Sequence, residues 1–189
     1  MKFLKIHIVI LLVLFLSSCD ENTYPRSRGN VRLEYPTAEY SLYNSDELKM
    51  SFNKSDYAIV EKKNDSWINL AYPKMKAKLH LSYFDVNGNI VSLISDIQKL
   101  TDEHKIKASG IIPHEFSNPE EKVYAVVYEI IGNSASNIQF YATDSINHIV
   151  SGSLYFRTRP NYDSLAPAIQ YLKEDIVTLL ESLKWKKNN

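Results

Sequence analysis

The sequence predicts an α+β domain in which a mostly antiparallel sheet of about six to seven strands carries two amphipathic helices. The chain has 189 residues, of which 44% are hydrophobic and 23% charged, a composition typical of one globular domain and unlike that of a disordered chain. Thirteen tyrosines against five glycines favour strands with few tight glycine turns. Apolar residues also alternate in several short runs and recur at helical spacing in two longer ones.

The first half of the chain is predicted to consist of strands. Apolar and polar residues alternate in four short runs, and a turn at Pro73-Lys74 is expected to join the last two of them. The secondary structure of residues 46–52 is ambiguous from the sequence. The predicted strands are Val31–Tyr35, Tyr57–Lys62, Trp67–Tyr72 and Lys76–Phe84.

The second half is predicted to hold two helices and a three-stranded antiparallel meander. One helix covers Asn89–Glu103, and the other starts at Asp163 or Ser164, with Pro167 in its first turn. We expect the apolar stripe of the second helix to pack on the domain's own sheet; a surface for a partner helix or a membrane is the alternative. The three strands are Lys122–Ile131, which is almost continuously apolar and therefore expected to be buried on both faces, then Asn137–Ala142 and His148–Arg157.

The chain closes with a strand, a helix and an aromatic residue, Trp185. This order is similar to the end of the PsbP/Mog1 type of α/β/α sandwich. The likeness concerns the fold alone and implies no function.

The first nineteen residues have the pattern of a lipoprotein signal peptide. Two lysines precede the eleven-residue apolar run Ile6–Leu16, which is too short to cross about 30 Å of hydrocarbon. The run leads into Ser17-Ser18-Cys19, which predicts cleavage between Ser18 and Cys19 and a lipid on the Cys19 thiol. A signal peptide of the ordinary secretory type, or an uncleaved anchor, is the alternative.

The predicted organisation is a removed signal peptide (1–18), a lipidated tether (19–30) and one globular domain (31–189). Two or more acyl chains on Cys19 would hold the domain stably on a bacterial membrane, outside the cytoplasm and facing the periplasm. The sequence leaves open whether this is the inner or the outer membrane. Asp20 after the cysteine retains lipoproteins in the inner membrane of enteric bacteria, but an acidic pair need not do so in other phyla.

Few residues suggest catalysis or metal binding. A single cysteine excludes an intramolecular disulfide and a thiolate zinc site, and 22 basic against 22 acidic residues give no sign of nucleic-acid binding. No phosphate-binding glycine loop, GxSxG or HExxH motif is present. We therefore expect no cofactor, no metal and no small-molecule substrate. The histidines after the signal peptide lack ligand spacing and are expected at the surface: His80, His104, His114 and His148.

Two surface features suggest other roles. Tyr24, Arg26, Arg28 and Tyr35 could dock a partner or a glycan, because tyrosine is common at interfaces; half-buried strand positions are the alternative reading of the tyrosines. Ser145, in Asp144-Ser145-Ile146, matches an acceptor pattern for periplasmic O-glycosylation in Bacteroidota. Ser164 matches it too, although helix capping explains that copy equally well.

Eight segments after Cys19 form long, ordered matches to one known family: Tyr24–Gly29, Trp67–Tyr83, His104–Ala108, Val123–Ser136, Gln139–Ser145, Leu154–Phe156, Asn161–Pro167 and Lys184–Lys186. On these matches the chain resembles, over nearly the whole mature length, the GldD family of gliding-motility lipoproteins of Bacteroidota. Arg26-Ser27-Arg28 departs from the family pattern, since a Lys-Pro-Arg-like run is expected there.

The resemblance implies a non-enzymatic accessory lipoprotein of the gliding machinery, coupled to type IX protein secretion, that assembles or stabilises other envelope proteins. It brings no catalytic residue with it. Two alternatives are an envelope enzyme acting on peptidoglycan or glycan through His80, His104 or His114 with a carboxylate, and a small-ligand-binding lipoprotein with a deep apolar pocket.

Overall fold

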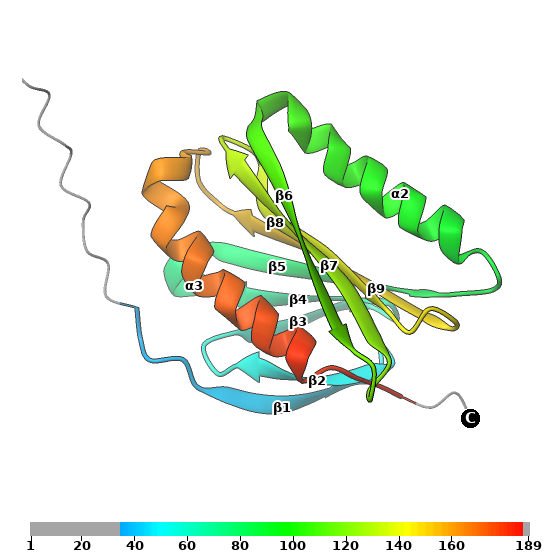
Figure 1. The fold of residues 1–189 in the computed structure, drawn as a ribbon. Coiled ribbons are helices and arrows are strands. Elements are labelled where there is room, and N and C mark those ends of the chain that lie inside the picture. The colour runs from blue at the N-terminus through cyan, green and yellow to red at the C-terminus, as the bar shows by residue number, and fades with distance from the viewer. Residues whose placement is uncertain (1–34, 187–189) are drawn as a thin grey trace, which may run out of the picture. The chain divides into compact units, whose positions relative to one another are not determined.

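The computed structural model describes residues 35–186, which form two antiparallel sheets and two long helices (Figure 1). Two short 3₁₀ helices, Pro73–Met75 and Glu103–Lys107, connect some of them. The elements in chain order are β1 (Tyr40–Ser45), β2 (Met50–Ser55), β3 (Ile59–Asn64), β4 (Trp67–Tyr72), β5 (Ala77–Asp85), α2 (Ile90–Asp102), β6 (Ala108–Asn118), β7 (Val123–Gly132), β8 (Ser136–Thr143), β9 (His148–Phe156), α3 (Tyr162–Glu181) and β10 (Lys184–Trp185).

The larger sheet has seven strands in the order β3-β4-β5-β9-β8-β7-β6, and every neighbouring pair is antiparallel. The predicted turn at Pro73-Lys74 and the predicted meander from β7 to β9 are therefore confirmed. The smaller sheet, β1-β2-β10, was not predicted. The α+β class with two helices on a mostly antiparallel sheet is confirmed. The strand predicted at Val31–Tyr35 lies, apart from Tyr35, outside the described residues.

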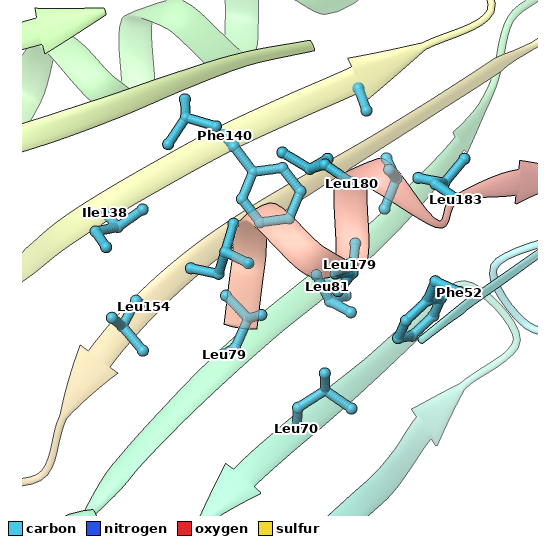
Figure 2. Packing of buried hydrophobic residues seen from close by; sticks show 14 of the residues in the cluster. Phe52, Leu70, Leu79, Leu81, Ile138, Phe140, Leu154, Leu179, Leu180 and Leu183 are labelled. Atoms are coloured by element: carbon cyan, nitrogen blue, oxygen red, sulfur yellow. The ribbon is translucent and has the colours of Figure 1, made fainter. Parts of the chain in front are cut away.

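Helix α3 covers one face of the seven-stranded sheet and also contacts β2 (Figure 1). The prediction that its apolar stripe packs on the domain's own sheet is confirmed, since Ile169, Leu172, Ile176 and Leu179 are buried against the core. Figure 2 shows this core, in which Phe140 lies between β8 and the helix. Side chains fill the space here, which leaves no deep apolar pocket between α3 and the sheet in the described part of the chain.

The start of α3 differs from the prediction. Asn161 is the N-cap, and its side chain accepts a hydrogen bond from the backbone N–H of Ser164. Asp163 and Ser164 lie inside the first turn instead, where the negative charge of Asp163 interacts favourably with the positive end of the helix dipole. The helix ends at Glu181, so Lys184 and Lys186 do not belong to its last turn.

Helix α2 lies against the opposite face of the sheet, as two hydrogen bonds indicate. The Thr101 hydroxyl donates to Gln139 Oε1 at 2.8 Å, whereas on the other face Lys173 of α3 pairs with Glu129. The predicted stripe of α2 is only partly covered, because Leu100 is 59% exposed and the other four members are half-buried: Ile90, Leu93, Ile94 and Ile97.

One burial prediction is wrong. β7 alternates between buried and more exposed positions, and β8, one strand further in from the sheet edge, is the strand buried on both faces. β8 lies under α2 as well as α3, and β6 beside β7 is the sheet edge. A continuous apolar run therefore did not identify the doubly covered strand.

Candidate functional site

The face of the seven-stranded sheet that carries α2 has no helix over β3, β4 and β5 in the part of the chain that the structure describes. Because side chains alternate along a strand, this surface is set by the register of the pairs Asn69–His80 and Lys78–Tyr155. We call it the open face and define it by Glu61, Trp67, Asn69, Lys78, His80 and Tyr155.

Three rings form a row across the open face, from β4 through β5 to β9. The centroid of the His80 ring lies 5.9 Å from that of Trp67 and 5.3 Å from that of Tyr155, and the Tyr155 contact is edge-to-face. Trp67 is 37% exposed, and the other two rings are half-buried. We call these three residues the aromatic row; they present flat apolar surface with polar edges, which is the composition of many binding surfaces.

Hydrogen bonds hold the open face in one conformation. The indole N–H of Trp67 donates to Asn69 Oδ1 at 2.9 Å, and Asn69, which is 1% exposed, lies beside Glu61. Lys78 donates to Glu61 Oε2 at 2.8 Å. That bond, together with the Asn69 amide, lowers the pKa of Glu61 to about 2.

His80 occupies a central strand of the sheet, so its predicted place at the surface holds only in part. Burial, and then the charge of Lys78, lower its pKa. The side chain is therefore neutral at pH 7 and behaves as an aromatic surface with one N–H donor.

A second polar cluster lies where the ends of the two sheets meet. We define the His148 cluster by Lys49, Tyr83, Asp85, His148 and Trp185. Tyr83 donates its hydroxyl proton to Asp85 at 2.9 Å, and His148 Nδ1 lies 2.6 Å from the same hydroxyl oxygen. Lys49 closes the chain with an ion pair to Asp85 at 2.6 Å.

Trp185 covers this cluster. Its ring stacks on the His148 imidazole, with centroids 5.3 Å apart and planes 10° apart, while its indole N–H donates to the Lys122 carbonyl. His148 is consequently 4% exposed, so the prediction that it lies at the surface is wrong, and this burial lowers its pKa. A neutral imidazole protonated at Nδ1 can donate to the Tyr83 oxygen while the Tyr83 hydroxyl donates to Asp85, so both of these protons have an acceptor.

An open hollow of about 430 Å³ adjoins the His148 cluster. Asp144, beside His148 in its lining, is 9% exposed and accepts backbone hydrogen bonds from three successive residues, 146 to 148. Burial alone would raise the pKa of Asp144, but these three N–H groups outweigh it, and the pKa is lowered. Asp144 is thus occupied in shaping the loop between β8 and β9.

Ser145 is exposed at the tip of that loop, with a backbone φ of 69°. Its hydroxyl is accessible for the predicted O-glycosylation. Ser164 is also exposed, but it lies in the first turn of α3, where its backbone N–H is bound by Asn161.

A group of tyrosines is committed to the interior of the domain. Tyr35 stacks on Tyr171 of α3, with ring centroids 4.9 Å apart, and its hydroxyl is buried. Tyr40 donates to Asp175 at 2.9 Å, and Tyr72 is 4% exposed. For these residues the structure favours half-buried packing over a partner surface. Tyr24, Arg26 and Arg28, like Ser18 and Cys19, lie outside the described residues.

Of the other candidate histidines, His104 lies outside the described side chains, and nothing in the described range brings His80 or His114 into a catalytic or metal centre. His114 lies on the edge strand β6, and its Nε2 is 3.4 Å from the carboxylate of Glu129 on β7. Lys173 already pairs with that carboxylate. Within residues 35–186, no three His, Cys, Asp or Glu side chains form a group that could hold a metal ion. None of the described helices is long and apolar enough to cross a membrane.

The fold and the open face together define a small α+β domain that offers one solvent-facing sheet surface with exposed aromatic side chains. The chain belongs to the family of the gliding motility lipoprotein GldD, whose model matches residues 20–185. Membership makes it an accessory lipoprotein of gliding motility and implies a lipid-anchored position in the cell envelope. Comparison with curated proteins and with solved structures found no match.

Neither candidate site could be found from sequence alone. The open face depends on the register between β3, β4, β5 and β9, and the His148 cluster joins residues from β5, β9 and β10. Alternation in Lys76–Phe84 did place His80 on the polar face of its strand, which was the one usable signal.

Proposed function

We propose that this chain is a non-enzymatic binding module of the bacterial gliding machinery, coupled to type IX secretion in Bacteroidota. A lipid on Cys19 holds it on a membrane, with the domain in the periplasm, where it assembles or stabilises other envelope proteins. Family membership supports the motility role. The observation that carries the binding role is the aromatic row, which lies on the open face of the sheet with Trp67 exposed, and whose three side chains are not part of the domain's core cluster.

The geometry of the open face suits the binding of a protein partner. Trp67 is fixed by its bond to Asn69, so little side-chain entropy is lost when a partner covers it. The surrounding Glu61–Lys78 pair supplies a polar rim. Attachment to a membrane raises the local concentration of the domain near other envelope proteins, so a weak contact is sufficient.

The role in the apparatus is tested by deletion and complementation. Deleting the gene should abolish colony spreading and type IX export, and the wild-type gene should restore both. Intact spreading and export in the deletion strain would contradict the proposed role.

The binding surface is tested separately with Trp67→Ala in the complementing gene. Loss of a central aromatic residue from an interface costs about 2 kcal/mol, or roughly a thirtyfold loss of affinity. Leu42→Ala, which truncates a residue that is 63% exposed on β1, is the matched control. We expect crosslinking to neighbouring envelope proteins to fall in Trp67→Ala and not in Leu42→Ala. Equal crosslinking in both, at wild-type protein levels, would remove the open face from the proposal.

An envelope enzyme is the second candidate, favoured by the hydrogen-bonded chain from His148 through Tyr83 to Asp85. The stacked Trp185 ring argues against it, because a general base must reach its substrate. Alanine at each of His80, His104, His114 and His148 decides the question. Full complementation by all four variants would remove the enzyme. Loss of function in a variant of His104, His114 or His148 that still folds would favour it, whereas a loss at His80 would not, because His80 belongs to the aromatic row.

A further inference from the structure

One end of the seven-stranded sheet combines exposed apolar and cationic groups around the 3₁₀ turn Pro73–Met75. We call this surface the basic end and define it by Ile59, Lys74, Met75, Lys76, Lys78 and Arg157. Two hollows meet there and share Tyr72 and Pro73 in their linings.

The first hollow is apolar. It has a volume of about 210 Å³ and is lined by residues that include Ile59, Met75 and Pro36, with Lys74 at its side. Ile59 lies on the edge strand β3 and is 58% exposed. A large aliphatic side chain in this position contacts water across most of its surface, which favours a partner with an apolar layer.

The second hollow, of about 470 Å³, is lined by Lys76, Lys78 and Arg157, with Glu61 as its one carboxylate. Glu61 is already bound by Lys78 and by Lys63 at 3.3 Å. In the described part of the chain Lys74, Lys76 and Arg157 have no ion-pair partner. The hollow therefore carries a net positive charge that an anion would neutralise.

The path of the chain indicates which anion reaches this end. The described chain begins at Tyr35, and Pro36 lines the apolar hollow, so the segment from Cys19 enters the domain here. Sixteen residue steps separate Cys19 from Tyr35, and a random coil of that length would span about 20–25 Å. A lipid on Cys19 would thus keep the basic end close to the membrane surface.

We propose that the basic end docks on an anionic phospholipid surface, with Lys74, Lys76 and Arg157 against the phosphate headgroups and Ile59 directed into the interfacial layer. This contact orients the domain, whereas the lipid on Cys19 only tethers it. The inference rests on the proposed membrane attachment, but the contact itself needs no lipid on the protein.

The test uses residues 19–189 with Cys19→Ser, so that binding by the basic end is measured without the anchor. Cosedimentation is measured with vesicles of phosphatidylcholine alone and of an equal mixture with phosphatidylglycerol. We expect binding to the mixed vesicles only, weakening as salt is raised. Lys74→Glu combined with Lys76→Glu should weaken that binding at least about thirtyfold. Lys99→Glu combined with Lys107→Glu makes the same charge change elsewhere and should leave it nearly unchanged.

Lys74→Gln combined with Lys76→Gln should give an intermediate loss, and thermal unfolding should be the same in all variants. Two results would overturn the proposal: wild-type binding that is absent or equal on both kinds of vesicle, or equal losses in the two Glu pairs. If the wild type ignores vesicles while the Lys74/Lys76 pair abolishes colony spreading, the basic end contacts a protein instead, and the motility role survives. Spreading and export that persist in the deletion strain would contradict the motility role and leave the vesicle result standing.

Discussion

Alanine at Gly152 tests how tightly the centre of the seven-stranded sheet is packed. Gly152 lies on β9, paired with Phe140 on β8, and the Phe140 ring lies directly over its backbone. A Cβ at this position would be 2.2 Å from Phe140 Cε1 and 2.3 Å from Cζ. Carbon atoms in contact need about 3.5–4.0 Å, so the ring would have to move by more than about 1 Å. Phe140 is 1% exposed, which leaves it no space for that shift.

The expected cost follows from this overlap. Inserting a methyl group into a well-packed core destabilises a protein by about 1–3 kcal/mol, and we expect the upper end here because the contact is with a buried ring. For a chain of this size, 3 kcal/mol corresponds to a fall in Tm of roughly 6–12 °C. Urea unfolding of Gly152→Ala measures the loss. Gly110→Ala, where a Cβ meets nothing within 4 Å, is the control and should change stability by less than about 0.5 kcal/mol.

A double-mutant cycle with Phe140→Leu identifies the cause. If the clash with the ring is responsible, Gly152→Ala should cost less in the Phe140→Leu background, with a coupling free energy of about 1–3 kcal/mol. A cost that is the same in both backgrounds, or one no larger than that of Gly110→Ala, would refute the packing argument.

Three further changes give distinct outcomes. Burial raises the pKa of Asp175, so the folded state binds a proton more tightly than the unfolded state, and stability falls as pH rises above the ordinary carboxyl range. Asp175→Asn should remove this fall. Its stability at pH 7, measured by urea unfolding, should equal or exceed that of the wild type. Burial lowers the pKa of His148, so the unfolded state takes up a proton before the folded state does. The contribution of His148 to stability is therefore complete above about pH 6.5 and is lost as pH falls below it. His148→Gln should flatten that acid-side loss in a thermal-unfolding series, and an unchanged pH profile would contradict the assignment. If Ser145 carries a glycan, the intact mass of the purified mature protein should exceed polypeptide plus lipid, and Ser145→Ala should remove the excess; a wild-type mass without excess excludes the modification.

The strands and helices that follow a clear period could be predicted from the sequence. The Trp67–Tyr72 strand, the pairing of the next strand with it and the extents of both helices agree with the structure to within a few residues, because alternation and 3.6-residue spacing directly encode one buried side. β6 was missed because Gly110 and Pro113 interrupt it. Proline is tolerated there because β6 is an edge strand, a fact that only the sheet order reveals.

The smaller sheet escaped prediction for a different reason. β1 and β2 are short and mostly polar, and β10 has two residues, so none has a period that can be recognised. They are held by tertiary contacts: Phe52 and Met50 are fully buried against α3, and Trp185 packs on His148. Such strands are stabilised by contacts with residues that are distant in sequence, and a local pattern of apolar residues cannot indicate those contacts.

The basic end and the aromatic row lie on different parts of the sheet, so only one orientation of the anchored domain lets both make their proposed contacts at once. A lipid tether limits how far a domain moves from the membrane but leaves it free to rotate, so an anchored binding surface faces its partner only part of the time. If the basic end rests on headgroups, the sheet stands on one end, and the aromatic row on the flank of the sheet, at Trp67 and His80, is turned toward neighbouring envelope proteins. Removing the basic end should then weaken partner capture even though the aromatic row is intact, and only for the protein in its membrane. In detergent the wild type and the variant with Lys74→Glu and Lys76→Glu should capture partners equally. That result would separate an effect on the orientation of the domain from an effect on the contact itself.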